Sequence, residues 1–334
     1  MSGSVARKLS ATKLAGNDVV IGGLRYYGKL SILSCGIFWK SQMIRHWKKF
    51  LSGLMYMTLT GSLQAQMNMN PYFTAFNAPL EKHSVMLMAL PDFQVSRFGN
   101  NYFTGMLMAQ YGLTSQLTIG VMAEGQKIDG LPATFGGTRY NAYFHLFPDD
   151  RLLNLTLYGE YENLNGAALY KMEVSGFGPG DLMKPLSVAR STSVRTFEQR
   201  VIIYHDWDRL NATFNFIRET ALQTPHGNDY GYALGLFINP SWMSNGSMAG
   251  MAGMATSPII SMNRLGYGLE MMGALGDNKR FGFHWSSQQQ YLGPLFLYAI
   301  SPSWSMRLET AFGLSKVSDP LIMRFGLSYM FSSV

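Results

Sequence analysis

Hydrophobic and polar positions alternate in short segments along the chain from about residue 85 to its end. Residues 322–331 show the pattern most clearly, because every second residue from Met323 to Phe331 is large and apolar or aromatic. Polar or small residues such as Arg324 and Ser328 lie between them. A period of two residues places one set of side chains on each face of a β-strand. One face therefore suits an apolar environment and the other a polar one.

The same alternation predicts twelve strands, each long enough to cross a bilayer when tilted. We expect them at about 85–95, 102–112, 115–125, 138–147, 152–162, 194–206, 210–221, 229–238, 265–275, 286–300, 305–314 and 322–331. An even number of antiparallel strands is typical of bacterial membrane barrels. Ten or fourteen strands remain alternatives.

These strands predict an all-β fold, a membrane-spanning antiparallel up-and-down β-barrel of about 12 strands. A soluble β-sandwich is the alternative, but it needs a charged outer face, and both sets of alternating positions here are poor in Lys and Glu. Membrane barrels have short turns at one end and longer loops at the other. Residues 126–137 and 163–193 fit long loops. The long stretch 239–264 falls on the short-turn side, so it is either an unusual connection or hides a missed strand pair.

Composition agrees with a membrane barrel. The chain is 47% hydrophobic and 13% aromatic but only 14% charged, against about 25% charged in typical soluble domains. Aromatic residues near strand ends are candidates for the two interfacial girdles. They are Tyr111, Phe147, Tyr204, Trp207, Trp242, Trp285, Trp304, Tyr329 and Phe331.

The N-terminal part predicts export. Basic residues after Met43 precede the apolar stretch Leu51–Leu63, and Ala65 supplies a small residue at a cleavage site. We interpret residues 43–65 as a signal peptide; a short amphipathic helix or core segment is the alternative. The domains expected are a non-native or mis-annotated extension over 1–42, the signal peptide over 43–65 and the barrel over 66–334. A genuine N-terminal extension is the other possibility for 1–42.

The net charge of +7 comes from this leader. Residues 1–65 hold nine Lys or Arg and one Asp, so the remaining chain has 18 basic and 19 acidic residues and a net charge of −1. The basic balance is thus no sign of nucleic-acid binding. The single cysteine, Cys35, lies in the leader. The barrel would then have no disulfide, as suits passage through an oxidising compartment.

Charged residues at inward-facing positions are the candidate functional site. The predicted lumen-lining residues are Glu124, Glu160, Glu162, Glu198, Arg200, Glu219, Glu270, Arg307, Glu309 and Arg324, with His145 on the same face. Opposite charges could pack as a network that closes the lumen, or the same groups could line a selective pore. The excess of Glu over Arg would favour cations.

Methionine is the second candidate chemistry. Met248, Met251 and Met254 recur every three residues in a Gly- and Ala-rich stretch, and thioethers are soft ligands that select Cu(I). Simple packing in an apolar groove is the alternative reading. No cofactor motif is present, and we expect no enzyme. A phospholipase-like barrel would need a Ser near a His on one strand face, yet no Ser lies two residues beyond His145 or His205.

Two segments resemble known proteins. Arg324–Phe331 looks like the aromatic-ended last strand that the barrel-assembly machinery reads, with Tyr329 and Phe331 as the assembly signal, although three residues follow Phe331. Residues 158–167, 212–218 and 230–235 resemble a group of uncharacterised Gram-negative outer-membrane barrels, some of them associated with heavy-metal efflux systems. The resemblance implies the same fold.

We therefore expect a porin-like protein of the cell outer membrane, a narrow channel or transport accessory for ions or small solutes. The alternative is a non-conducting barrel with a structural or interaction role, linked to copper. Expected partners are outer-membrane lipid, the barrel-assembly machinery and an efflux or transport partner, with no nucleic acid and no cofactor.

Overall fold

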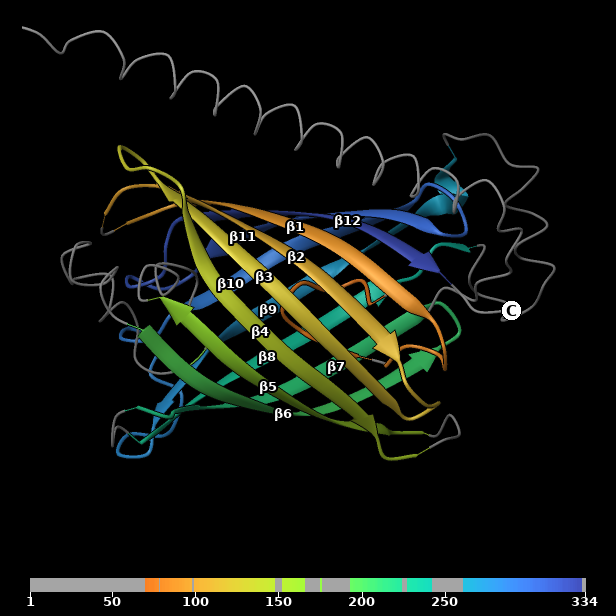
Figure 1. The fold of residues 1–334 in the computed structure, drawn as a ribbon, viewed down its shortest axis with the longest axis horizontal. Helices are drawn as coiled ribbons and strands as arrows, with labels where there is room; N and C mark the ends of the chain where they lie inside the picture. Colours follow the sequence, from red (N-terminus) through yellow and green to blue (C-terminus); the bar gives the residue numbers. More distant parts are fainter. Residues whose placement is uncertain are drawn as a thin grey trace, which may run out of the picture. The chain divides into compact units, whose positions relative to one another are not determined.

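Twelve antiparallel strands pair in sequence order, and the first pairs with the last, which closes a barrel (Figure 1). The computed structural model describes residues 70–331, except 78, 98, 148–151, 166–174, 176–192, 224–226 and 242–260. The strands are β1 (Val85–Val95), β2 (Tyr102–Gly112), β3 (Leu117–Ile128), β4 (Thr134–His145), β5 (Asn154–Asn165), β6 (Ser193–Trp207), β7 (Leu210–Ala221), β8 (Asn228–Ile238), β9 (Leu265–Asp277), β10 (Gln290–Ala299), β11 (Trp304–Gly313) and β12 (Leu321–Phe331). A 3₁₀ turn at Met262–Arg264 precedes β9.

Closure explains why alternating strands are stable together. Every strand has a hydrogen-bonded neighbour on both sides, so no backbone edge faces lipid, where no partner for it exists. Val85 at the start of β1 lies opposite Phe331 at the end of β12. Within the described part of the chain, no helix has the length and apolar character to cross a membrane.

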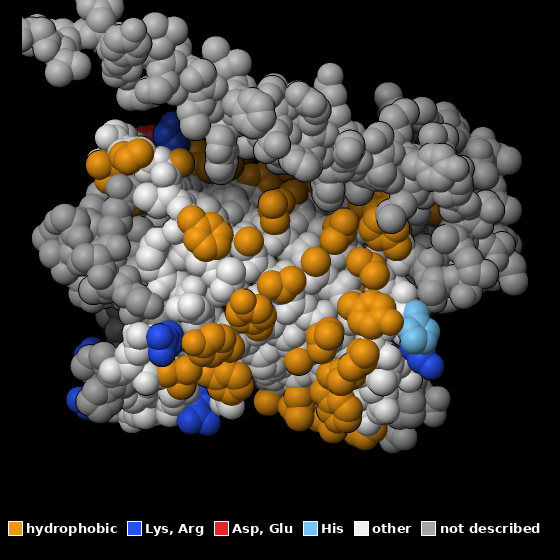
Figure 2. Space-filling view, viewed as in Figure 1, with side chains coloured by type: hydrophobic (Ala, Val, Ile, Leu, Met, Phe, Trp, Pro, Cys, Tyr) orange, Lys and Arg blue, Asp and Glu red, His pale blue; other side chains and the backbone are white. Residues whose placement is uncertain are grey.

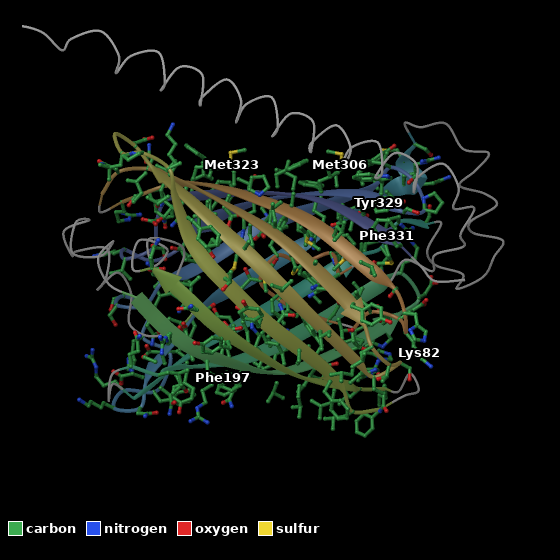
Figure 3. The ribbon with its side chains drawn as sticks, viewed as in Figure 1. Lys82, Phe197, Met306, Met323, Tyr329 and Phe331 are labelled. Carbon is green, nitrogen blue, oxygen red and sulfur yellow. The ribbon has the colours of Figure 1, made fainter. Side chains whose placement is uncertain are left out.

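The outside of the wall is apolar. Side chains on the outward positions are exposed Leu, Ile, Val, Phe and Tyr, for example Leu107, Val121 and Phe296. Figure 2 shows hydrophobic side chains over the barrel wall, with Lys and Arg toward its ends. Met306, Met323 and Phe197 project from this wall in Figure 3. Such a surface requires lipid as its solvent.

The predicted strands are confirmed, with corrections at their ends. β3 extends to Ile128 and β4 begins at Thr134, because the two strands stay paired beyond a bulge between Glu124 and Gly125. The connection predicted over 126–137 is therefore only 129–133. β8 pairs directly with β9, so no further strand lies between them in the barrel wall. Residues 239–264 therefore connect two neighbouring strands at the end where the other connections are short.

The aromatic residues near the ends are only partly as expected. Trp207 and Trp285 are exposed on the outside, which suits an interfacial girdle. Tyr204 was wrongly assigned, because it is buried in the lumen beside His145, with ring centroids 6.0 Å apart. Tyr329 and Phe331 contact each other on β12, near the end of the barrel where Lys82 also lies (Figure 3). Their role as an assembly signal stays a prediction.

Candidate functional site

A segment that precedes β1 crosses the inside of the barrel. We call residues 70–80 the lumenal segment; it is part of the orange trace inside the ring of strands (Figure 1). At one end, the backbone N–H of Leu80 donates to Thr118 on β3, 2.8 Å away. At the other, the Tyr72 hydroxyl donates to Asn211 on β7, 2.7 Å away. The segment therefore spans the lumen from one side of the wall to the other.

Side chains of the wall satisfy the backbone of the lumenal segment. Glu270 on β9 accepts from the N–H groups of Phe73, Thr74 and Ala75 at 3.0, 2.7 and 2.6 Å. Asn215 on β7 accepts from the N–H of Phe76 at 2.8 Å and donates to its carbonyl at 2.8 Å. An extended backbone without a neighbouring strand needs such partners when buried. The inward polar residues thus form a receptor for this segment.

Arginine side chains hold the carbonyl groups of the same segment. Arg307 on β11 donates to the carbonyls of Asn70 and Tyr72 at 2.6 and 2.9 Å. Arg200 on β6 donates to the carbonyl of Thr74. Arg324 on β12 donates to the Thr74 hydroxyl at 2.6 Å. Hydrogen bonds from a charged donor are stronger than neutral ones, so arginines on three strands hold the segment in place.

Tyr72 fits against a glycine of the wall. Its ring lies so close to Gly235 on β8 that a Cβ atom there would be 2.1 Å from the ring. The ring also packs edge-on against Phe237, with centroids 6.1 Å apart. The close contact and the hydrogen bond to Asn211 together fix the position of the Tyr72 ring.

On the opposite side of the lumen one arginine joins three carboxylates. Arg139 on β4 lies 2.7 Å from Glu124 on β3 and 3.1 Å from Glu160 on β5, and it also pairs with Glu162. All four side chains are buried. Tyr158 donates to the second oxygen of Glu160 at 2.5 Å. Buried charges of this kind are stable only when paired and hydrogen-bonded.

Carboxylates also stand in register on consecutive strands. Glu160 on β5 lies opposite Glu198 on β6, which lies opposite Glu219 on β7. The register continues to Asp229 on β8 and Asp277 at the end of β9. We call these five residues the acidic row. Like charges directly opposite one another repel, so the row needs compensating positive charge.

Each of four members of the acidic row has a partner among the residues that the structure describes. Arg139 pairs with Glu160, and Arg200 pairs with Glu198 at 2.6 Å. Glu219 accepts a hydrogen bond from the Ser175 hydroxyl. Asp277, at the exposed end of β9, accepts backbone bonds from Lys279 and Arg280 at 2.7 and 2.8 Å. The row thus runs from an exposed strand end to the buried lumen.

The structure places the predicted lumen-lining residues inside the barrel. Nine of them line a common cavity or contact the lumenal segment: Glu124, Glu160, Glu162, Glu198, Arg200, Glu219, Glu270, Arg307 and Arg324. The tenth, Glu309, is buried on β11. Their role in lining a path for solutes stays a prediction.

Two central residues were missed. Arg139 shares the inward face of β4 with His145, at an even spacing, so the same alternation could have found it. Asp92 on β1 pairs with Arg324, with 3.1 Å between Oδ2 and Nη2. The sequence did not indicate that Asp92 faces inward, because its inward neighbours Met88 and Leu90 are apolar and both faces of β1 therefore have a similar composition.

Metal binding finds no support in the residues that are described. Met248, Met251 and Met254 lie outside them, as do the leader residues 1–65. Among the described His, Cys, Asp and Glu side chains, no group of three or more has an arrangement that could hold a metal ion. The copper-linked reading therefore stays a prediction for the connection 239–264.

A closed antiparallel barrel with an apolar outside and a polar, hydrogen-bonded inside defines the class of this protein. It is a transmembrane β-barrel of the outer-membrane type.

No family model and no curated protein sequence matches the chain. Among solved structures, it is similar to the KdgM porin, with a TM-score of 0.44 and 10% identity over 74% of this chain and 99% of that one. An outer membrane channel from Pseudomonas putida F1 gives a TM-score of 0.49 and 8% identity over 76% and 97%. LpxR from Salmonella typhimurium gives 0.37 and 8% over 73% and 100%. At these scores the fold assignment rests on the strand pairing described above.

Proposed function

We propose that this barrel is a narrow channel for cations or other small solutes, closed in the state described here by the lumenal segment. The observation that carries the proposal is the way in which the segment is held. Side chains of Glu270, Arg200 and Arg307 bind its backbone by separate hydrogen bonds. Arg324 donates to the Thr74 side chain. Contacts of this kind can be broken one at a time and remade, which suits a gate.

The charge of the lumen supports cations as the preferred solutes. The acidic row reaches from the exposed end of β9 to Glu160 deep in the barrel. Rings or lines of carboxylates set a preference for cations in pores. Removal of the lumenal segment would leave these groups facing an open lumen. A barrel of this size is wide enough for a narrow channel when its interior is not filled.

A non-conducting barrel with a structural or interaction role is the second candidate. It is favoured by the apolar packing of Tyr72 and Phe73 against β7–β12, which resembles a permanent core. A link to a heavy-metal efflux system and recognition by the barrel-assembly machinery through Tyr329 and Phe331 are further proposals, each resting on sequence resemblance. A catalytic role is not part of either candidate.

Single-channel conductance in planar bilayers tests the proposal, with protein purified from membranes. Glu270→Gln removes the charge that accepts three N–H groups of the lumenal segment, so we expect the open probability to rise. A tenfold rise corresponds to only about 1.4 kcal/mol, and each bond to a charged group contributes about 1.5–3 kcal/mol. The open state should prefer potassium over chloride.

Glu81→Gln is the matched control, because Glu81 is an exposed carboxylate outside the lumen. It should conduct like the wild type. Folding of each variant is checked by the shift in gel mobility on heating. If folded Glu270→Gln protein remains silent at every voltage, the channel proposal is wrong and the non-conducting barrel takes its place.

A further inference from the structure

The half of the lumen beside β1–β6 is not filled by the lumenal segment. It contains a cavity of about 180 Å³, bounded by that segment on one side and by the strands on the other. An engineered protein cavity of about 150 Å³ is enough to bind benzene. The space is therefore of a size for a small organic molecule, and much larger than a bare metal ion needs.

One wall of the cavity is made of methionine. Met88 on β1 lies opposite Met108 on β2, which lies opposite Met122 on β3. We call these three residues the methionine row; Met86 and Met106 line the same cavity. Thioethers are flexible and polarisable, and they make favourable contacts with aromatic rings. The wall can adapt its shape to an apolar or aromatic body.

The facing wall is acidic. Glu160, Glu198 and Glu219 of the acidic row all line the cavity. In the described lining, six carboxylates meet four guanidinium groups, an excess of two negative charges. Two of the guanidinium groups, those of Arg307 and Arg324, also bind the lumenal segment. A cation placed between Glu198 and Glu219 would relieve the repulsion along the row.

We infer that this cavity binds a small organic cation, an ammonium ion with an aromatic or alkyl body of about benzene size. The ammonium lies against Glu198 and Glu219, and the body lies on the methionine row. The inference names the solute class of the proposed channel and rests on that proposal for transport, whereas binding itself does not require conductance. The outer members of the acidic row, Asp229 and Asp277, give the cation a path from the exposed strand ends.

Other ligand classes fit the cavity less well. An anion would meet the carboxylates of the acidic row directly. A neutral aromatic molecule would fill the methionine wall but leave the repulsion among the carboxylates unchanged. A soft metal ion would compete at Met88 with Arg307, whose guanidinium already donates to the Met88 sulfur. Only a cation with an apolar body matches both walls at once.

Isothermal titration calorimetry with the protein in lipid nanodiscs tests this inference, and empty nanodiscs correct for partition into lipid. The probes are phenethylammonium, neutral 2-phenylethanol and anionic 3-phenylpropanoate, which share a phenyl ring and differ in charge. We expect the ammonium to bind at least about tenfold more tightly than the alcohol, a difference of about 1.4 kcal/mol. No heat of binding is expected from the carboxylate.

Two pairs of variants locate the site. Glu219→Gln keeps an acceptor for the Ser175 hydroxyl and should weaken phenethylammonium binding about tenfold, the effect of one charge-assisted bond; Glu81→Gln should not. Met108→Ala should weaken it severalfold, whereas Met323→Ala, on the lipid-facing side of β12, should not. Melting of each variant on a heated gel shows that it has folded.

Three results would overturn the inference. The first is equal binding of all three probes. The second is ammonium binding that survives both Glu219→Gln and Met108→Ala. The third is silence toward phenethylammonium together with tight, Met108-dependent binding of Ag⁺, which would assign the cavity to a soft metal. If the protein conducts but fails these titrations, the solute class is wrong and the channel proposal stands. If it binds phenethylammonium but does not conduct, the channel proposal is wrong and the binding site stands.

Discussion

The two halves of the lumen are built from the same kind of strand but are filled differently. Beside β7–β12, Tyr72 and Phe73 of the lumenal segment join a continuous apolar cluster with inward residues such as Phe237, Leu295 and Leu297. Beside β1–β6, a cavity remains between methionines and buried charges. The difference lies in the inward side chains, which are mostly apolar where the lumenal segment packs and are methionines and charged groups where the cavity remains.

The two halves also differ in the groups that stabilise their buried carboxylates. In the filled half, Glu270 accepts hydrogen bonds from three backbone N–H groups of the lumenal segment. In the hollow half, Glu124, Glu160 and Glu162 depend on the guanidinium of Arg139. Removing one residue should therefore have different consequences on the two sides, which three substitutions can test in order of decreasing effect.

The largest effect is expected in the hollow half. Arg139→Met leaves three buried carboxylates without their shared cation, and breaking a buried ion pair in this way costs about 3–5 kcal/mol. We expect a corresponding loss in the free energy of unfolding, measured by urea titration of the protein in lipid vesicles. Arg218→Met is the control, because Arg218 is exposed and bonds only to Asn228 among the contacts described. If both variants lose the same free energy of unfolding, the ion pairs of Arg139 do not contribute more to stability than an exposed hydrogen bond.

A smaller effect is expected in the filled half. Gly235→Ala places a Cβ atom into the ring of Tyr72, and such overpacking costs about 1–3 kcal/mol. The ring can move only with the lumenal segment, so hydrogen exchange at residues 72–76 should become faster while exchange in the strands is unchanged. At Gly159 an added Cβ makes only ordinary contact with Phe197, so Gly159→Ala should leave exchange as in the wild type. Unchanged exchange in Gly235→Ala would mean that Tyr72 does not anchor the segment.

The smallest effect concerns Asp319, which connects the two halves at the far end of the barrel. Its carboxylate accepts hydrogen bonds from Gln94 and, at 2.8 Å, from the backbone N–H of Arg97. Burial raises the pKa of Asp319 above its ordinary value. A carboxyl group with a raised pKa in the folded state destabilises that state when ionised, so stability should rise as the pH falls through this pKa.

The gain should be complete below the ordinary pKa of aspartate, about 3.9. The comparison is made by urea titration of wild type and Asp319→Asn between about pH 4 and 7, the range in which a carboxyl group with a raised pKa titrates. We expect the wild type to gain stability relative to the variant as the pH is lowered. A gain of the same size in both proteins would assign the pH dependence to other groups.

Much of the fold could be predicted from local pattern. The bounds of β1, β2 and β7 agree with the alternation, since each begins and ends where the period of two does. The ends of β3 and β4 were missed because pairing continues across a bulge at Gly125, where the local pattern is interrupted. Bulges depend on the partner strand, so one strand's sequence does not reveal them.

The lumenal segment was not predicted, although the sequence of β10 contains an indication that something apolar packs inside the barrel. Leu295 and Leu297 face inward while Leu292 and Phe296 face outward, so both faces of this strand are apolar. A strand that is apolar on both faces needs an apolar partner on each, and in this barrel the inner partner is the chain itself. The polar contacts of the segment join residues far apart in sequence, such as Thr74 and Glu270, and no local pattern connects them.

The sequence by itself determined the strands, the face on which each side chain lies and the class of the protein, because a period of two residues is a local property of the backbone. Only the tertiary structure decided which inward groups meet. Arg139 finds three carboxylates, five acidic residues fall into one row, and Glu270 receives the lumenal segment. These contacts follow from the register of pairing around a closed ring and from the path of residues 70–80 through it. Both are set by the whole barrel at once, because the shift of any strand moves every inward group relative to its neighbours.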